Sequence, residues 1–181
     1  MDQIEITPAL QLRPLQLNDA PPLFALTDRN RAYLRQWLPW LDQTRAESDA
    51  VSFIESMIKA AADGTRFTFG VWRADTLGGV AGFNEIDRAN NIGTIGYWLG
   101  QEHTGYGLMT KAVRKLVLYG FTKLTLNRIV IKVATANRRS QAIPDRLGFT
   151  REGILRESEW LYDHYVDVTV NGLLKKETST S

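Results

Sequence analysis

The chain has 181 residues, of which 44% are apolar and 23% charged, values that are typical of a folded globular protein and argue against wholesale disorder. It contains no cysteine, which excludes disulfides, thiolate metal sites and cysteine nucleophiles. No apolar run approaches the roughly 20 residues that span a bilayer, and the first residues lack a signal-peptide pattern. We therefore expect one soluble, cytoplasmic domain over residues 1–181, with a polar tail from about residue 175.

The charge is concentrated in one part of the chain. The whole chain carries 22 Lys and Arg against 20 Asp and Glu, a net charge of +2, whereas residues 104–156 alone carry a net charge of +9. This basic segment begins at a glycine-rich turn. A polyphosphate ligand on that turn explains the placement with fewer assumptions than a nucleic acid does.

The first third of the chain predicts one strand and three helices. Residues 10–15 alternate between apolar and polar side chains and include a proline, as an edge strand does. Asp19 can cap the first helix, and Pro39 stops the second. Thr44 and Glu47 have capping-box spacing ahead of apolar residues at helical period. We expect helices over about 19–26, 30–38 and 45–62.

Three alternating segments follow, and the short turns between them predict an antiparallel meander. After a turn that contains Gly100, Gly105 and Gly107, an apolar face at helical period predicts a helix to Phe121. The β-branched segment behind it predicts a parallel strand, because strand–helix–strand connections are parallel crossovers. A short helix, which Ser140 can cap, and a hairpin complete an α+β fold with a mixed sheet. The predicted strands of these regions cover residues 66–72, 80–86, 94–99, 127–133, 153–160 and 165–173.

The turn from Gly100 to Gly107 precedes a helix whose first residues carry no acidic side chain. Glycines allow several backbone N–H groups to converge, and a helix N-terminus adds about half a positive charge at the same place. This local arrangement suits a phosphate or pyrophosphate. A purely structural strand-to-helix turn is the alternative.

Six short motifs carry a family resemblance. They are Gly96-Tyr-Trp-Leu, Gly105-Tyr-Gly-Leu-Met-Thr-Lys-Ala, Leu126-Asn-Arg, Asn137 with Ser140, Leu147-Gly-Phe, and Asp163 with Val166 and Asp167. In this order, and after a meander, they resemble the Gcn5-related N-acetyltransferases (GNAT). Within that family the chain is similar to the RimL/RimJ-like branch, which acetylates the N-termini of ribosomal proteins. The similarity spans roughly residues 10–174.

The resemblance implies a GNAT fold, with a mostly antiparallel mixed sheet flanked by helices on both faces. It also implies acetyl transfer from acetyl-coenzyme A, with the pantetheine arm along residues 96–99 and the pyrophosphate on the glycine turn. Thr104 stands where the family usually has Gln or Arg, a departure of little weight because backbone N–H groups bind the phosphate. The implied cofactor-binding residues are Tyr97, Trp98, Leu99, Thr104, Gly105, Tyr106, Gly107, Leu108, Met109, Thr110 and Asn137.

Acetyl transfer needs a donor to the oxyanion that develops on the thioester and a proton for the departing thiolate. The family carries a bulge in the strand at residues 96–99 that exposes a backbone N–H, so we expect the oxyanion donor near Trp98 or Leu99. By resemblance, Asn137 bonds the pantetheine arm and Ser140 is the general acid. The residue pattern leaves open that Ser140 is only a helix cap.

The acceptor amine needs a general base. By resemblance this is Glu159 on the late hairpin, with Glu85 and Asp87 on the meander as the alternatives. An α-amine has a reference pKa near 8, against about 10.4 for lysine, so the base has little work to do on such an acceptor. His103 and His164 are too few and too isolated for a metal site, and no metal is expected.

The resemblance indicates that the acceptor is the N-terminal α-amine of a protein, typically a ribosomal protein. A polyamine or aminoglycoside acceptor is the enzymatic alternative. A non-catalytic module that binds acyl-coenzyme A or nucleic acid through the basic segment is the other, and a membrane partner is not expected. Tyr33, Trp37 and Trp40 belong to the core or, by resemblance, border the acceptor cleft and a homodimer contact.

Overall fold

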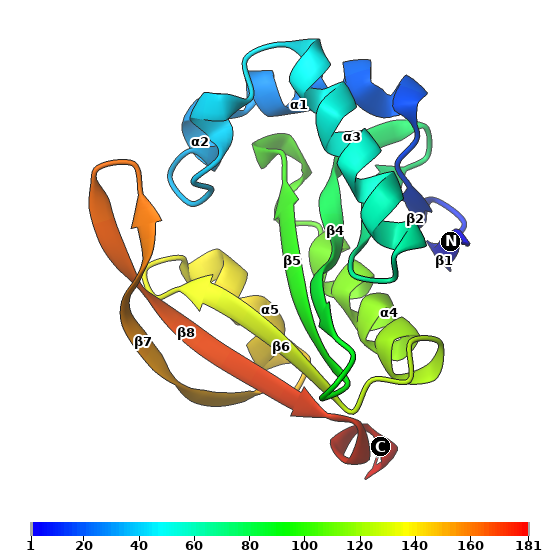
Figure 1. Ribbon diagram of the computed structural model, residues 1–181, viewed down its shortest axis with the longest axis vertical. Helices are drawn as coiled ribbons and strands as arrows, with labels where there is room; N and C mark the ends of the chain where they lie inside the picture. The colour runs from blue at the N-terminus through cyan, green and yellow to red at the C-terminus, as the bar shows by residue number, and fades with distance from the viewer. Residues whose placement is uncertain (1, 181) are drawn as a thin grey trace.

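The computed structural model describes residues 2–180, which fold around one eight-stranded sheet (Figure 1). The strand order is β1-β2-β3-β4-β5-β6-β8-β7, and all neighbouring strands are antiparallel except the parallel pair β5 and β6. The strands are β1 (Ile4–Thr7), β2 (Leu10–Pro14), β3 (Phe67–Arg73), β4 (Thr76–Asp87), β5 (Ile92–Leu99), β6 (Arg128–Ala134), β7 (Thr150–Leu161) and β8 (His164–Leu174). The predicted meander and parallel crossover are both confirmed.

Helices cover both faces of the sheet, as expected (Figure 1). They are α1 (Ala20–Arg29), α2 (Arg31–Leu34), α3 (Glu47–Ala62), α4 (Leu108–Thr122) and α5 (Arg138–Arg146), with the 3-10 turns η1 (Leu17–Asp19), η2 (Leu41–Gln43), η3 (Gln101–His103) and η4 (Lys175–Thr180). The helices α4 and α5 share the larger apolar core on one face, and α1 and α3 share a second core on the other. Within residues 2–180, no helix is long and apolar enough to cross a bilayer.

The helix α4 is fixed by an apolar face that recurs at helical spacing. Ala112, Val113 and Leu116 on this face are fully buried against the sheet. Gly120 permits a close approach, because a Cβ there would lie 2.8 Å from the ring of Phe83. Packing in this way places the N-terminus of α4 at the glycine turn, directly after the end of β5.

The strands β5 and β6 pair only over their first halves. Their register runs from Ile92 opposite Arg128 to Ile95 opposite Ile131 and then stops. Beyond this pair, residues 96–99 of β5 do not pair with residues 132–134 of β6, and the two strands diverge (Figure 1). The sheet therefore opens into a gap toward the carboxyl ends of its two parallel strands.

Two predictions about the N-terminal third are wrong. Residues 10–15 are not an edge strand, because β1 pairs along the outer side of β2. The helix predicted over 30–38 is the four-residue α2, which ends at Leu34. A short edge strand and a single helical turn each leave too little periodicity in the sequence to be recognised.

Two helix caps also differ from prediction. At α3, Thr44 and Glu47 do not form a capping box; instead Asp49 accepts the backbone N–H groups of the two residues before the helix, at 2.7 and 2.9 Å. At α5, the cap is Asn137, whose Oδ1 accepts the backbone N–H of Ser140 at 3.1 Å. The hydroxyl of Ser140 is thereby released from the capping role that the sequence suggested.

Candidate active site

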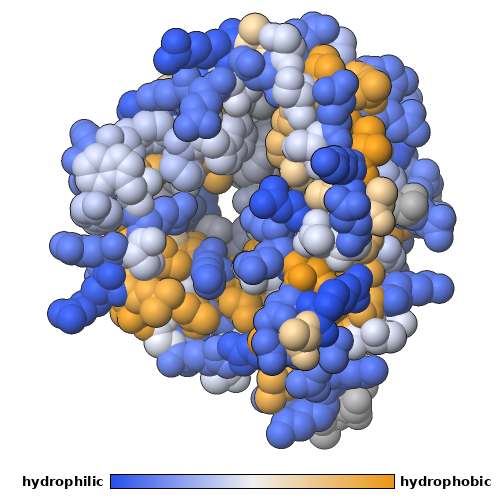
Figure 2. Space-filling view, in the orientation of Figure 1, coloured by the Kyte–Doolittle hydropathy of each residue, from blue (hydrophilic) through white to orange (hydrophobic). Residues whose placement is uncertain are grey.

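A cavity of about 650 Å³ occupies the gap between β5 and β6. One wall is built by α1, α3 and the strands β3 to β5, and the opposite wall by β6, the start of α5 and the β7–β8 hairpin. Figure 2 shows the molecule hollowed between the N-terminal helices and the hairpin. The cavity therefore lies between the two faces of the sheet, where β5 and β6 separate.

The cavity brings together five of the predicted site residues. Tyr97, Trp98, Asn137, Ser140 and Glu159 all line it, although they come from β5, α5 and β7. The other predicted residues lie outside its lining: Leu99, Thr104, Gly105, Tyr106, Gly107, Leu108, Met109, Thr110, Glu85 and Asp87. The glycine turn is thus a separate part of the predicted coenzyme A site.

Ser140 lies in the first turn of α5 with its hydroxyl uncommitted. Its backbone N–H is held by Asn137, but within residues 2–180 its Oγ has no hydrogen-bond partner. The Nδ2 of Asn137 likewise has none there. Both groups line the cavity, so each is free to bond a ligand.

A proline in α5 explains how Ser140 is tied to β5. Pro144 has no N–H, so the carbonyl of Ser140 loses the helical donor four residues later. The hydroxyl of Tyr97 replaces that donor and bonds the Ser140 oxygen at 3.0 Å. Burial raises the pKa of Tyr97 to about 12, which keeps its hydroxyl a donor.

Glu159 reaches the cavity through an irregularity in the hairpin. Leu155 pairs with Val168 and Glu159 pairs with Val166, so residues 156–158 of β7 face Asp167 alone. The carboxylate of Asp167 holds this bulge by accepting the backbone N–H of residue 157 at 2.8 Å. Bulges of this kind re-aim the side chains that follow them.

The carboxyl of Glu159 is half-buried and has no ion-pair partner within residues 2–180. Burial raises its pKa, which is the environment of a proton acceptor rather than of a fixed charge. Glu85, by contrast, is exposed outside the cavity. Asp87 accepts the N–H and the side-chain amide of Asn90, which lowers its pKa. Residues 2–180 hold no cluster of three or more carboxylates and histidines that could bind a metal ion.

The bulge expected in β5 is in β4 instead. From Gly96 to Leu99, β5 pairs with β4 without interruption, and the register shifts at Asn84. The N–H of Gly100 donates to the carbonyl of Gly78 at 2.9 Å and therefore points toward β4. Because successive N–H groups of a strand point to opposite sides, this bond fixes the direction of the other N–H groups at this end of β5. Those of residues 97 and 99 face the gap, and that of Trp98 faces β4.

The glycine turn has the geometry of an anion site. Gly105 and Gly107 have φ values of 88° and 69°, and a Cβ at either would meet no atom within 4 Å. No backbone or side-chain acceptor within residues 2–180 binds the N–H groups of residues 105–110. The side chains of Leu108 and Met109 are buried in the core, so only their backbone is available to a ligand. Free N–H groups, a helix N-terminus and open space fit a pyrophosphate.

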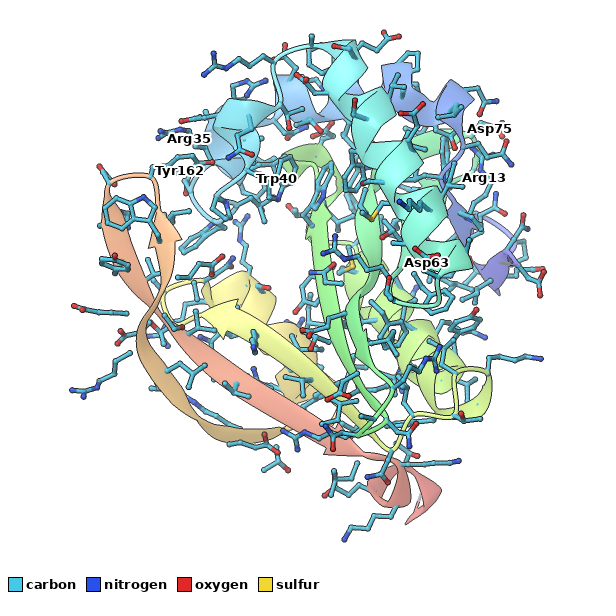
Figure 3. The ribbon with its side chains drawn as sticks, in the orientation of Figure 1. Arg13, Arg35, Trp40, Asp63, Asp75 and Tyr162 are labelled. Carbon is cyan, nitrogen blue, oxygen red and sulfur yellow. The ribbon has the colours of Figure 1, made fainter. Side chains whose placement is uncertain are left out.

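The tip of the hairpin is hydrogen-bonded to the loop before α3, a contact that no sequence pattern predicts. The hydroxyl of Tyr162 donates to the carbonyl of Leu38 and accepts the N–H of Leu41. Arg35 stacks on the Tyr162 ring, 3.7 Å from its centroid, and forms a bidentate ion pair with Asp42. Arg35 and Tyr162 lie next to one another where α2 meets the hairpin (Figure 3). Leu38, which accepts this hydrogen bond, also lines the cavity, so the contact joins the hairpin tip to the cavity wall.

Sequence reasoning also missed much of the cavity wall. Of the three aromatic residues that were expected in the core or at the acceptor cleft, Trp37 and Trp40 line the cavity and Tyr33 does not. The ring centroids of Trp40 and Trp98 are 6.1 Å apart. The missed lining residues include Asp49, Phe53, Ser56, Met57, Arg66, Thr68, Asn84 and Lys132. A helix that faces a cavity and one that faces the core have the same periodicity, which is why no signal separated them.

Comparison with known proteins places this geometry in a family. The acetyltransferase (GNAT) domain model matches residues 9–150. The ribosomal-protein-serine acetyltransferase of Escherichia coli (strain K12) is 31% identical over 93% of this chain and 94% of its own length. The putative ribosomal N-acetyltransferase YdaF of Bacillus subtilis (strain 168) is 32% identical over 93% of this chain and 92% of its own.

Solved structures agree in fold as well as in sequence. RimL, a ribosomal L7/L12 alpha-N-protein acetyltransferase in complex with coenzyme A, superposes with a TM-score of 0.93 at 27% identity, over 96% of this chain and 98% of that one. The microcin C7 self immunity acetyltransferase MccE, in complex with acetyl-CoA and AMP, gives 0.90 at 30% identity, over 93% and 94%. The chain therefore belongs to the GNAT acetyltransferase family, in its RimL/RimJ-like branch, and is an N-acetyltransferase.

Proposed function

We propose that the protein transfers the acetyl group of acetyl-coenzyme A to the N-terminal α-amine of a protein, and that a ribosomal protein is its target. The observation that carries this proposal is one cavity that joins the uncommitted hydroxyl of Ser140 to the uncompensated carboxyl of Glu159. The printed functions of the E. coli relative and of RimL support a ribosomal acceptor. A cytoplasmic location and a homodimer stay predictions.

Acetyl-coenzyme A supplies the thioester carbonyl that the amine attacks. Coenzyme A or acetyl-CoA is bound in the RimL and MccE structures, and the residues of this chain fit the same ligand. The free N–H groups of residues 105–110 would hold the pyrophosphate, and the gap-facing backbone of residues 97 and 99 would run beside the pantetheine arm. The free Nδ2 of Asn137 would bond the same arm.

The chemical roles follow from what each group can donate or accept. Glu159 takes a proton from the acceptor amine, directly or through a water, and its raised pKa suits it to that task. The N–H of Leu99, which faces the gap, is the candidate donor to the oxyanion that develops on the carbonyl. The hydroxyl of Ser140 gives its proton to the departing thiolate.

A pH–rate study of Glu159→Gln tests the base. In the wild type, kcat should fall as the pH drops through the raised pKa of Glu159, because the protonated carboxyl cannot accept a proton. The variant should have a lower kcat and should lose that limb of the profile. An unaltered acidic limb would reassign the base, and Glu85→Gln and Asp87→Asn would then identify which alternative carries it.

A substitution of Ser140 tests the acid. Ser140→Ala should lower kcat more than it raises the KM for acetyl-coenzyme A, because the hydroxyl acts on the leaving group and Asn137 caps the helix without it. A kcat equal to that of the wild type would remove Ser140 from the mechanism. The helix should stay intact in either case, and circular dichroism checks this.

The acceptor class is tested by a thiol-release screen with acetyl-coenzyme A. Peptides with different N-terminal residues, spermidine and an aminoglycoside are the acceptors to compare. We expect release with peptides, and loss of it when the N-terminus is blocked. Release with the small amines and with no peptide would overturn the protein acceptor.

A further inference from the structure

Asn84 occupies the bulge of β4 and projects into the cavity. Phe83 pairs with Ile95 and Glu85 pairs with Thr94, so Asn84 is the extra residue of β4 and has no partner on β5. Within residues 2–180, no hydrogen bond holds its carboxamide, and the residue is exposed to the cavity that it lines. A bulge that presents an unbonded polar side chain to a cavity is a feature that function can use.

The carboxamide of Asn84 lies directly over Gly96. A Cβ built on Gly96 would be 2.1 Å from Nδ2 of Asn84, 2.8 Å from its Cγ and 3.0 Å from its Oδ1, and these are the three nearest heavy atoms. Gly96 is the first residue of β5 beyond the last β5–β6 pair. The amide therefore lies at the narrow end of the gap.

Three hydroxyl groups that line the same cavity as Asn84 have already given their protons to protein acceptors. Ser56 donates to the carbonyl of Phe53 at 2.7 Å, Thr68 to the sulfur of Met57 at 3.1 Å, and Thr27 to its own helix at 2.9 Å. On the wall built by α1, α3 and β3 to β5, the carboxamide keeps both a donor and an acceptor free. A ligand hydroxyl, which also both donates and accepts, is its matching partner.

The opposite wall has the group that suits an amine. The carboxyl of Glu159 lacks an ion-pair partner within residues 2–180, and a carboxylate bonds an amine more strongly than a neutral amide does. We propose that the amine of the acceptor pairs with Glu159 and that its first side chain faces the other wall. There Asn84, which occupies the space left by the missing Cβ of Gly96, contacts that side chain and selects a hydroxyl, as in serine or threonine.

This inference rests on the proposed protein acceptor and adds a residue that sets its specificity. The test uses peptide pairs that differ only by a hydroxyl at the first residue: Ser against Ala, and Thr against its isostere Val. The wild type should have the higher kcat/KM for the hydroxyl member of each pair. Asn84→Ala should lower that preference roughly threefold to tenfold, the value of one hydrogen bond, and change the rate with the Ala peptide little. Gln11→Ala, which removes an amide outside the cavity, should keep the wild-type preference.

Gly96→Ala supplies a second variant that leaves Asn84 in the chain. Its new Cβ must displace the carboxamide, so it should reduce the preference as Asn84→Ala does. Together, the two substitutions should reduce it no further than Asn84→Ala alone, because the displaced group is then absent. A ratio of two rates is unaffected by a smaller folded fraction.

The possible results separate a failure of the proposed acceptor class from a failure of the role of Asn84. If the wild type acetylates no peptide, the proposed acceptor class fails and the inference falls with it. If it acetylates peptides and shows no preference within the pairs, or if Asn84→Ala keeps the preference, the acceptor class stands and the role of Asn84 is refuted. An equal loss of rate on both members of a pair would also refute it, because Asn84 would then serve the amine or the fold.

Discussion

The hydrogen bond from Tyr97 to the carbonyl of Ser140 can be measured through its dependence on Pro144. In Tyr97→Phe the carbonyl loses its donor, and Pro144 has no N–H to replace it. Leaving a buried acceptor without a partner costs about 1–3 kcal/mol. The carbonyl is only partly buried, so we expect a loss of about 1–2 kcal/mol in the free energy of unfolding, or roughly 2–8 °C in Tm for a chain of this size.

Pro144→Ala restores the missing N–H, so in that background the same substitution should cost less. The double-mutant cycle for Tyr97→Phe and Pro144→Ala, followed by urea unfolding, should give a coupling energy of about 1 kcal/mol. The cycle cancels whatever Pro144→Ala costs by itself through lost packing. An equal loss in both backgrounds would refute the reasoning, since the Tyr97 hydroxyl would then act on something other than this carbonyl.

Four further results are expected. The pKa of Tyr97 is about 12 in the folded protein and near 10 in the unfolded chain. The stability that this group contributes is therefore complete below pH 10 and is lost as the pH rises toward 12. Tyr97→Phe should reduce that loss of stability at high pH. Gly107→Ala places a residue with a Cβ at φ 69°, which costs about 1–2 kcal/mol of backbone strain. The variant should have a higher KM for acetyl-coenzyme A, and an unchanged KM would remove the turn from the coenzyme A site. Tyr162→Phe unfastens the hairpin tip and should raise the KM for the peptide while that for acetyl-coenzyme A stays constant; a change in the second alone would contradict this. Asp167→Ala frees the bulge that aims Glu159 and should lower kcat, so an unchanged kcat would show that the bulge holds without it.

Elements with strong local periodicity were predictable from the sequence. The meander, α4 and the crossover to β6 each show a clear period of two or 3.6 residues, and the structure places them within a few residues of the predicted ends. The N-terminal cap of α5 was not predictable in this way. Asn137 and Ser140 are both good capping residues three positions apart, and only the place where β6 ends selects Asn137.

The site was predictable where a motif marks it and not where tertiary contacts build it. Ser140 and Glu159 were implied by the family resemblance that the short motifs carry, and both line one cavity. Asn84 and Tyr162 gave no local signal. One depends on a register shift between two strands, and the other on a hydroxyl that bonds a loop more than a hundred residues away in the chain.

At Pro144, a local feature of the sequence leads directly to a tertiary contact. A proline inside a helix breaks a local rule, and such conflicts are expected at functional or strained sites. Here the carbonyl that it leaves without a donor belongs to Ser140, and the replacement donor, Tyr97, comes from β5 across the gap. Beyond Ile95 no backbone hydrogen bond links β5 to β6, so this side-chain bond ties β5 to the helix that follows β6. The missing hydrogen bond in α5 is thus replaced by a contact that crosses the gap in which Ser140 lies.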